Sequence, residues 1–260
     1  MTWITDEAVT LGVSDYSETS QIATLFTRGS GKVRLLAKGS KRPKNAFGGP
    51  LDSLQLVQAV FALRQHGGLG VLAELALRDG LPGLRSNLPA FYAASCAAEL
   101  VMMATEELDP NPELFKILAE VLKRLSRGDN SAILLYWFEA RLLVLLGLWP
   151  QLGECVACRR KRPALRGSYF CPAEGGILCR ECRKGPGGRA AGAAGAPAAA
   201  AGLPVRGKAL QALAFLSTAD DREAQRVRLA APTAADMRKL LRRYWSHVLG
   251  REPRAMRWVS

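Results

Sequence analysis

Residues 1–80 contain short segments in which apolar and polar positions alternate, and this period of two indicates β-strands with one buried face. Turn residues such as Gly29, Ser30 and Gly31 separate the segments. The predicted strands cover residues 7–13, 21–27, 32–37, 54–63 and 69–77. So many strands in so short a stretch favour a small closed or partly open barrel, for which the OB-fold is the natural candidate.

From residue 84 onward the apolar positions recur every three or four residues, which predicts helices. These helices cover residues 89–108, 113–125, 132–148, 207–216 and 233–249. The third is apolar nearly all round, as is typical of a buried helix. We therefore predict an α+β chain, with an OB-fold β-barrel over residues 1–82 and an all-α domain over residues 83–260. Within that domain, residues 185–202 are rich in Gly, Ala and Pro and are expected to form a linker.

The chain is strongly basic, with 36 Lys and Arg against 23 Asp and Glu and a formal net charge of +13. A surplus of this size favours polyanionic partners. Residues 19–51 contain no acidic residue. They contain seven basic ones, which we predict to bind DNA: Arg28, Lys32, Arg34, Lys38, Lys41, Arg42 and Lys44. Cations in a Gly-, Ser- and Pro-containing loop can follow a phosphate backbone and release its counterions. The alternative is a solvated loop without a partner.

Four of the six cysteines form two matched pairs, Cys155 with Cys158 and Cys179 with Cys182. Each pair can supply two thiolates from one tight turn, and two such pairs complete a tetrahedral zinc site. We predict one structural Zn²⁺ in a zinc finger over residues 153–184. A redox-active dithiol is the competing interpretation, but it needs a pair at a helix start within a βαβ unit. Cys171 and Cys96 are expected to be buried thiols outside the site.

Motifs for catalysis are missing from the sequence. Its two histidines, His66 and His247, lie far apart, and neither is near a nucleophile motif. The phosphate-binding loop of nucleotide hydrolases is also missing, and the acidic residues form no convincing magnesium site. We therefore expect a protein that is not an enzyme. No apolar run approaches the ~20 residues that cross a bilayer, and the N-terminus does not resemble a signal peptide, so we expect no membrane association.

The basic segment and the cysteine pairs together resemble the RecO family of bacterial recombination mediators. Residues 29–44 match that family's basic stretch in type and order, residues 47–51 continue it, and residues 175–182 match its glycine and cysteine element. The match runs through most of the chain but leaves out the predicted linker. Two positions depart from the family pattern: Asn45 stands where Ser is usual, and Cys171 is an additional thiol.

The resemblance implies an OB-fold followed by a helical domain with a zinc finger. It implies binding to single- and double-stranded DNA, annealing of complementary strands, and action with RecR to load RecA. The single-strand DNA-binding protein is a further implied partner, and the expected location is the cytoplasm, at the nucleoid. The alternative hypothesis is a protein-interaction adaptor with secondary DNA binding, whose docking surfaces would be the helix over residues 233–249 and the tail over residues 251–260.

Overall fold

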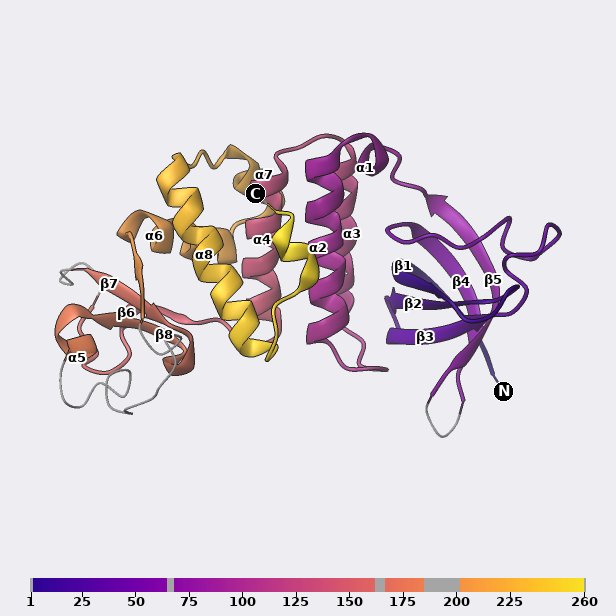
Figure 1. Ribbon diagram of the computed structural model, residues 1–260, viewed down its shortest axis with the longest axis horizontal. Coiled ribbons are helices and arrows are strands. Elements are labelled where there is room, and N and C mark those ends of the chain that lie inside the picture. Colours follow the sequence, from indigo (N-terminus) through magenta and orange to yellow (C-terminus); the bar gives the residue numbers. More distant parts are fainter. Residues whose placement is uncertain (1, 65–67, 162–166, 185–201, 260) are drawn as a thin grey trace. The chain divides into compact units, whose positions relative to one another are not determined.

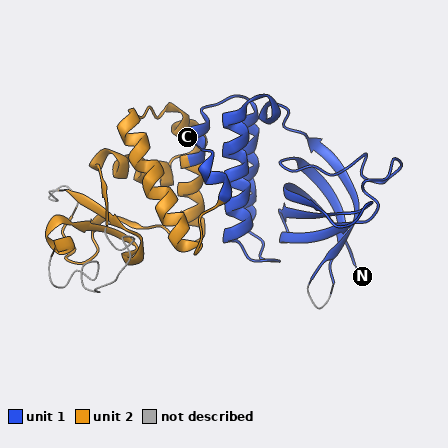
Figure 2. Ribbon diagram, in the orientation of Figure 1, with its two compact units in different colours: residues 1–135, 254–260 blue, residues 136–253 orange. Residues whose placement is uncertain are grey.

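The computed structural model describes residues 2–64, 68–161, 167–184 and 202–259 (Figure 1). It divides into two compact units, the first made of residues 1–135 and 254–260 and the second of residues 136–253 (Figure 2). Each unit contains both helices and strands, so the chain is α+β as predicted. These units are defined by compactness and divide the chain after residue 135. The predicted domain boundary at residue 82 therefore stays a prediction.

A five-stranded β-sheet forms the N-terminal part of the first unit. Its strands are β1 (Trp3–Asp15), β2 (Gln21–Thr27), β3 (Gly31–Ala37), β4 (Leu56–Ala62) and β5 (Gly70–Asp79). They close into a barrel in the order β1-β2-β3-β5-β4. Neighbouring strands are antiparallel except at the closure, where β3 and β5 pair in parallel. All five predicted strands are confirmed, with bounds that differ by a few residues.

Apolar and polar residues alternate along the strands, and this alternation gives the barrel a buried apolar core. On β3, Val33, Leu35 and Ala37 are buried in the barrel core, whereas Arg34 is exposed between them. Strand β1 pairs with β4 through its first half and with β2 through its second. A bulge between Thr10 and Gly12 interrupts its pairing with β2. Because a bulge bends and twists a strand, it lets β1 serve both neighbours and close the barrel.

The helices of the first unit follow the barrel: α1 (Gly83–Ser86), α2 (Leu88–Ala104) and α3 (Pro112–Ser126). Helix α4 (Ser131–Leu145) begins in this unit and continues into the second. The three longer helices start in the same way. The side chains of Asn87, Asn111 and Asn130 accept hydrogen bonds from the third backbone N–H that follows, at 3.1, 2.9 and 3.1 Å. Such caps satisfy N–H groups that a helix end leaves without partners.

Helix α2 ends at Ala104, before the predicted end at residue 108. The segment after it instead runs beside strand β3, where Glu107 forms a parallel bridge with Lys32 and Leu108 donates its N–H to the Lys32 carbonyl at 3.0 Å. Gly31 permits this approach, since a Cβ on it would lie 2.3 Å from the Asp109 carbonyl oxygen. Pairing with the barrel therefore replaces the last helical turn.

The second unit contains a small sheet as well as helices. Strands β6 (Gln151–Cys155), β8 (Gly176–Cys179), β7 (Ser168–Cys171) and β9 (Leu203–Val205) are neighbours in that order. The prediction of an all-α domain was wrong here, because strands this short carry too few residues to show a period of two. The helices are α5 (Arg180–Lys184), α6 (Gly207–Thr218), α7 (Asp221–Arg226) and α8 (Ala231–Val248). The predicted linker lies, up to residue 201, outside the described residues.

Large aromatic side chains fill the core of the second unit. Tyr136 and Phe138 of α4 and Trp245 of α8 are buried, as is Phe170 of β7. The Phe170 ring meets that of Tyr244 edge-on, with centroids 5.4 Å apart, so this core joins the small sheet to α8. Within the described ranges, no helix has the length and apolar character that a membrane span requires.

Candidate nucleic-acid interface and candidate metal centre

The segment that follows β3, residues 38–49, contains the densest group of cations and is here called the basic loop. Its anchor is Ser40, which is fully buried. The Ser40 hydroxyl donates to Gln21 Oε1 at 3.0 Å, and the same oxygen accepts the Leu51 N–H at 2.9 Å. Both Ser40 and Gln21 are neutral, so the loop is tied to strand β2 without burying a charge.

Asn45 holds the loop in its fold. Its amide nitrogen donates to the carbonyl oxygens of Ser40 and Arg42, at 3.0 and 2.6 Å. Its amide oxygen accepts the N–H groups of Phe47 and Gly49, at 2.7 and 3.3 Å. One side chain thus satisfies four backbone groups that a loop would otherwise leave to water. Serine, with a single hydroxyl, could not make all four contacts.

The turn between β1 and β2, residues 16–20, supports the loop from the other side. Ser20 Oγ accepts the Gly39 N–H at 3.1 Å, and the Thr19 carbonyl accepts the Lys41 N–H at 3.0 Å. The Lys41 ammonium lies 2.8 Å from a carboxylate oxygen of Asp15. The hydrogen bond from Lys41 holds the pKa of the Asp15 carboxyl below its usual value. The Asp15 carboxylate is therefore already paired with a cation of the loop.

The seven predicted DNA-binding residues do not occupy equivalent positions. Four are exposed and have no ion pair within the described part of the chain: Arg34, Lys38, Arg42 and Lys44. Arg28 is also exposed but lies 3.2 Å from Glu7, and Lys41 is paired with Asp15. Pairs of this kind at the surface are weak, so a phosphate can compete for both cations.

Lys32 differs from the other six because its side chain is half-buried. Its ammonium donates to the carbonyl oxygens of Met102, at 2.7 Å, and of Thr105. These carbonyls belong to the C-terminal end of α2, where a helix carries partial negative charge. Burial lowers the pKa of the Lys32 ammonium from its ordinary value. The contacts give Lys32 a structural role, as a cation that caps a helix.

Phe47, at the far end of the basic loop, packs against the barrel core. This contact favours a packing role for the ring over stacking on a nucleic-acid base.

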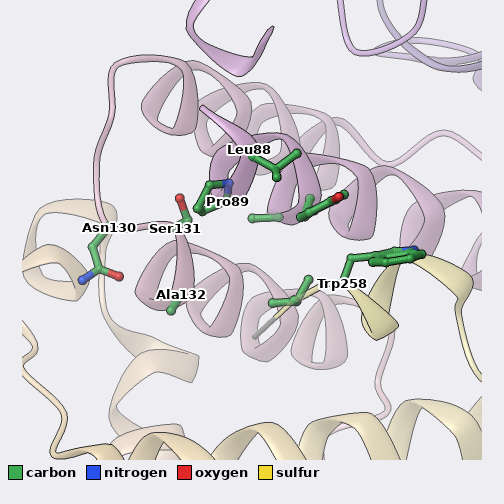
Figure 3. Close-up of a pocket in the computed structure, with 9 residues that line it drawn as sticks. Leu88, Pro89, Asn130, Ser131, Ala132 and Trp258 are labelled. Atoms are coloured by element: carbon green, nitrogen blue, oxygen red, sulfur yellow. The ribbon is translucent and has the colours of Figure 1, made fainter. Parts of the chain in front are cut away.

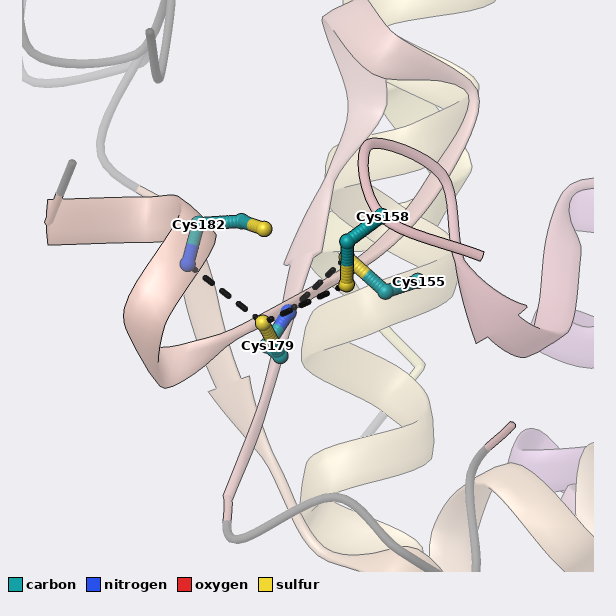
Figure 4. Close-up of side chains that lie close together, drawn as sticks. All are labelled: Cys155, Cys158, Cys179 and Cys182. Carbon is teal, nitrogen blue, oxygen red and sulfur yellow. Dashed lines mark hydrogen bonds between the residues drawn. The ribbon is translucent and has the colours of Figure 1, made fainter. Parts of the chain in front are cut away.

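The four paired cysteines come together in the second unit, as predicted (Figure 4). Cys155 ends β6, Cys158 lies in the turn that follows, Cys179 ends β8 and Cys182 lies in α5. Their sulfur atoms all lie within 4.8 Å of one another, and those of Cys158 and Cys179 are 3.9 Å apart. Four thiolates about 2.3 Å from a central zinc ion would be about 3.8 Å apart, so the spacing suits a tetrahedral site.

Backbone N–H groups point at two of the sulfur atoms. The Cys179 N–H donates to Cys155 Sγ at 3.4 Å, and the Cys182 N–H donates to Cys179 Sγ at 3.3 Å. Burial opposes ionisation of Cys155, but hydrogen bonds from the backbone of Cys158, Cys179 and Ala157 lower the pKa of its thiol to about 7. Hydrogen bonding to Cys179, burial and the neighbouring thiols raise the pKa of Cys182 to about 12.

These opposite shifts bear on what the site can hold. The cluster favours one thiolate but resists a full set, because negative charges this close repel one another. A divalent cation in the centre would remove that repulsion, and the set of four sulfur donors is the one that zinc prefers in structural sites. The residues present therefore fit a zinc ion.

Cys171 is buried beside Cys155 and Cys179 but is not one of the four clustered ligand candidates. Cys96 is buried in α2, in the other unit. Both agree with the prediction of thiols outside the site. Of the two aromatic residues that precede Cys171, Phe170 contacts α8, and the Tyr169 ring lies under the Arg183 guanidinium, at 4.2 Å.

Comparison with known proteins decides which family this chain belongs to. Residues 1–80 match the family model "Recombination protein O N terminal", and residues 85–257 match "Recombination protein O C terminal". The chain belongs to the RecO family. The RecO resemblance of the basic segment and cysteine pairs is thereby confirmed.

RecO relatives match over most of the chain. The DNA repair protein RecO of Bacillus subtilis is 32% identical over 176 residues, which cover 68% of this chain and 67% of that protein. The protein of the same name from Desulforudis audaxviator is 31% identical over 255 residues, 97% of this chain and 94% of that protein. That from Anaeromyxobacter sp. strain K is 31% identical over 253 residues, with the same coverage.

A feature of this RecO-family chain that sequence reasoning missed is a pocket on the first unit (Figure 3). The start of α2, the start of α4 and the C-terminal tail line it, with Leu88, Pro89, Ser131 and Trp258 among the lining residues. The Trp258 ring stacks on Tyr92 at a centroid distance of 5.8 Å and is 63% exposed. The only sequence signal was an aromatic residue in a basic tail, and its contact with α2 depends on tertiary structure.

Proposed function

We propose that the chain is a DNA-binding recombination mediator that binds single- and double-stranded DNA through its basic loop. The observation that carries the proposal is the loop itself, in which exposed cations are held by a network of neutral side chains. In this proposal Lys38, Lys41, Arg42 and Lys44 of the loop make the contacts, together with Arg34 on β3 and Arg28 in the turn between β2 and β3. Lys32, which caps α2, supports this surface indirectly. Membership of the RecO family supports the same conclusion.

The mechanism follows from electrostatics. Two complementary strands repel each other through their phosphates, and cations that neutralise those phosphates reduce the repulsion while releasing counterions. A row of cations on a fixed loop can hold a backbone without reading its bases. Annealing then takes its energy and its specificity from base pairing. The protein needs no catalytic group for this, and we propose that it is not an enzyme.

The wider role that we propose is the loading of RecA onto DNA together with RecR, with the single-strand DNA-binding protein as a second protein partner. This work would be carried out in the cytoplasm at the nucleoid. The strand order of the barrel and its parallel β3–β5 contact support an OB-fold as the DNA-binding domain. We assign this domain to residues 1–82 and the zinc-bearing domain to residues 83–260.

The cysteine cluster holds one structural zinc ion in this proposal, bound by Cys155, Cys158, Cys179 and Cys182. The ion would supply charge neutralisation and a fixed join between β6, β8 and α5. A site closed by four thiolates has no open coordination position, so its role is to stabilise the fold rather than to catalyse. The exposed Arg159 and Arg160 beside it are paired with Glu154 and Glu181.

The DNA-binding proposal is tested by fluorescence titration of labelled oligonucleotides at two salt concentrations. Phosphate contacts make the logarithm of the affinity fall linearly with the logarithm of salt concentration, by about 0.9 for each contact in a duplex. We expect a steep fall. An affinity that does not change with salt would overturn the proposal.

A matched pair of triple variants then tests the place of the interface. Changing Lys38, Lys41 and Arg42 to Glu should weaken DNA binding on the order of 100-fold and flatten the salt dependence. The control changes Arg159, Arg160 and Lys161 to Glu, an equal change of charge beside the cysteine cluster. It should have a much smaller effect. Equal losses in the two variants would remove the special status of the basic loop.

The second candidate function is that of an adaptor in which DNA binding is secondary. The pocket at Trp258 favours it, because an exposed ring at an open hollow suits an apolar side chain of a protein partner. A Trp258→Ala variant tests this candidate. The adaptor predicts loss of partner binding in a pull-down with RecR or the single-strand DNA-binding protein, and partner binding that is retained would reject the pocket as the docking surface.

A further inference from the structure

Tyr16 is an exposed aromatic residue at the edge of the barrel, with 61% of its surface accessible. It is the first residue of the turn that joins β1 to β2. The turn is closed by hydrogen bonds from the N–H groups of Tyr16 and Ser17 to the Ser20 carbonyl, at 3.0 and 3.2 Å. The backbone that carries the ring is therefore fixed. Across the described residues, no other aromatic ring contacts that of Tyr16.

The strand register places this ring beside the basic loop. Asp15 pairs with Gln21, and Gln21 pairs with Ala37, so these residues form one row across β1, β2 and β3. Tyr16 follows the first member of the row and Lys38 follows the last. With about 4.8 Å between neighbouring strands, the two positions are separated by roughly 10 Å. A strand whose phosphates lie on the loop can reach the ring with a base, since this spacing is on the scale of one or two nucleotides.

Two carboxylates lie close to Tyr16 in sequence. Asp15 is paired with the Lys41 ammonium, 2.8 Å away, and Glu18 of the same turn is exposed. The contact at Tyr16 therefore has to be made by a base, with the phosphates on the loop cations. The turn is bonded to the loop at Gly39 and Lys41, so the ring and the cations belong to one rigid surface. Phe47, the aromatic residue within the loop, packs on the barrel core. Its ring is therefore occupied by packing, whereas the ring of Tyr16 is exposed.

We propose that Tyr16 is a stacking platform for a base of single-stranded DNA whose phosphates are held by the basic loop. The inference rests on the proposed function and adds a preference to it. Stacking on an aromatic ring tolerates every base, because each has a π-face. Bases within a duplex are already stacked and paired, so they do not reach the ring. Tyr16 therefore favours unpaired strands, and a base leaves it when it pairs during annealing.

The test compares variants of Tyr16 in titrations of a labelled thymidine oligonucleotide and a blunt duplex of equal length. Tyr16→Ala should weaken binding of the single strand about 5- to 100-fold and change duplex affinity less than about twofold. The salt dependence should stay as in the wild type, because stacking releases no counterions. Tyr16→Phe keeps the ring and should bind as the wild type does. Tyr16→Leu keeps an apolar side chain without a ring and should behave as Tyr16→Ala.

Trp3→Ala is the matched control, because Trp3 is 55% exposed near the opposite end of the same strand. It should leave both affinities unchanged. Equal losses for single strand and duplex in Tyr16→Ala, or full affinity in Tyr16→Leu, would overturn the stacking role. If Tyr16→Ala binds DNA with the affinity and the salt dependence of the wild type, the stacking role is rejected and the proposed function still stands. Wild-type protein that binds DNA without salt dependence rejects both.

Discussion

The basic loop keeps its ionisable groups at the surface, whereas the second unit buries several of its own. In the loop, the interior contacts are made by neutral side chains, those of Ser40, Gln21 and Asn45. In the second unit, the thiols of Cys155 and Cys179 are buried, and Glu139 is only 3% exposed. Both regions place polar groups in their interior, but only the second unit buries groups that can carry charge.

The difference predicts how each region responds to its surroundings. Neutral groups that satisfy one another cost little to bury at any pH, so the loop is formed before DNA arrives. Buried thiols and carboxyls stay protonated unless a cation or hydrogen bonds stabilise their charge, as hydrogen bonds do at Cys155. The second unit should therefore depend on metal and pH, while the basic loop should depend on neither.

The largest expected effect is the loss of the metal site. Cys179→Ser removes one of four ligands, and because metal binding is coupled to folding we expect the second unit to lose on the order of 5 kcal/mol of unfolding free energy. The wild type should contain one zinc per chain by metal analysis. The variant should contain much less and should unfold at a lower temperature. DNA binding by the basic loop should persist.

Cys171→Ala is the control for this experiment. Cys171 is buried beside the same cluster but is not one of the four residues that group as ligands. It should keep one zinc per chain, whatever packing it loses. A full zinc content in Cys179→Ser, or a loss of zinc in Cys171→Ala, would show that the ligand set is a different one.

Glu139 provides the next effect, a pH dependence. Burial raises the pKa of this carboxyl from 4.5 to about 8. Between these values the unfolded chain releases the proton and the folded chain keeps it, so stability is highest below the unfolded pKa. It then falls as pH rises and levels off near pH 8, a loss of a few kcal/mol. Glu139→Gln stays neutral and should flatten the slope in unfolding curves measured from pH 5 to 9. An unchanged slope would contradict this account.

Lys32 and Arg34 sharpen the comparison within one strand, because they lie two residues apart on β3 and carry the same charge. Lys32→Met removes the cation that caps α2, and charged hydrogen bonds of this kind contribute about 2 kcal/mol. It should lower the stability of the first unit and change DNA affinity by less than about threefold. Arg34→Met should do the reverse, with weaker DNA binding and unchanged unfolding. Thermal unfolding and DNA titration measure both effects in each variant. If the two variants lost stability and DNA affinity to the same extent, Lys32 and Arg34 would not have different roles.

The barrel strands and the longer helices were predictable because their apolar periods are long enough to read. The alternation of Val33, Arg34 and Leu35 shows which side of β3 faces the core, and the structure agrees. The cysteine pairs were predictable for another reason, since their spacing reflects the geometry of the metal site itself. The sheet of the second unit could not be read from strands as short as β9 (Leu203–Val205).

Roles that depend on a distant partner escaped sequence reasoning. Lys32 belongs to a run of cations and was predicted to bind DNA like the others. Its helix-capping role arises because the carbonyls of Met102 and Thr105, distant in sequence, lie beside it in the fold. Asn45 was noted only as a departure from the RecO pattern, although its side chain organises the loop. A sequence shows which groups a residue carries but not which groups tertiary structure brings to it.

Asn45 supplies the smallest effect and the closest test of a preformed loop. Asn45→Ala removes hydrogen bonds to the backbone around it but leaves every cation in the chain. Because the groups are partly exposed and can bind water, we expect about 1 kcal/mol less stability. DNA affinity should fall about threefold, since binding must then order the loop. The slope of affinity against salt should stay the same, because the same phosphates are neutralised. Asn45→Ser keeps an acceptor, so its stability and DNA affinity should lie between those of the wild type and those of Asn45→Ala. A reduced slope in Asn45→Ala would show that this side chain positions individual cations rather than the loop as a whole.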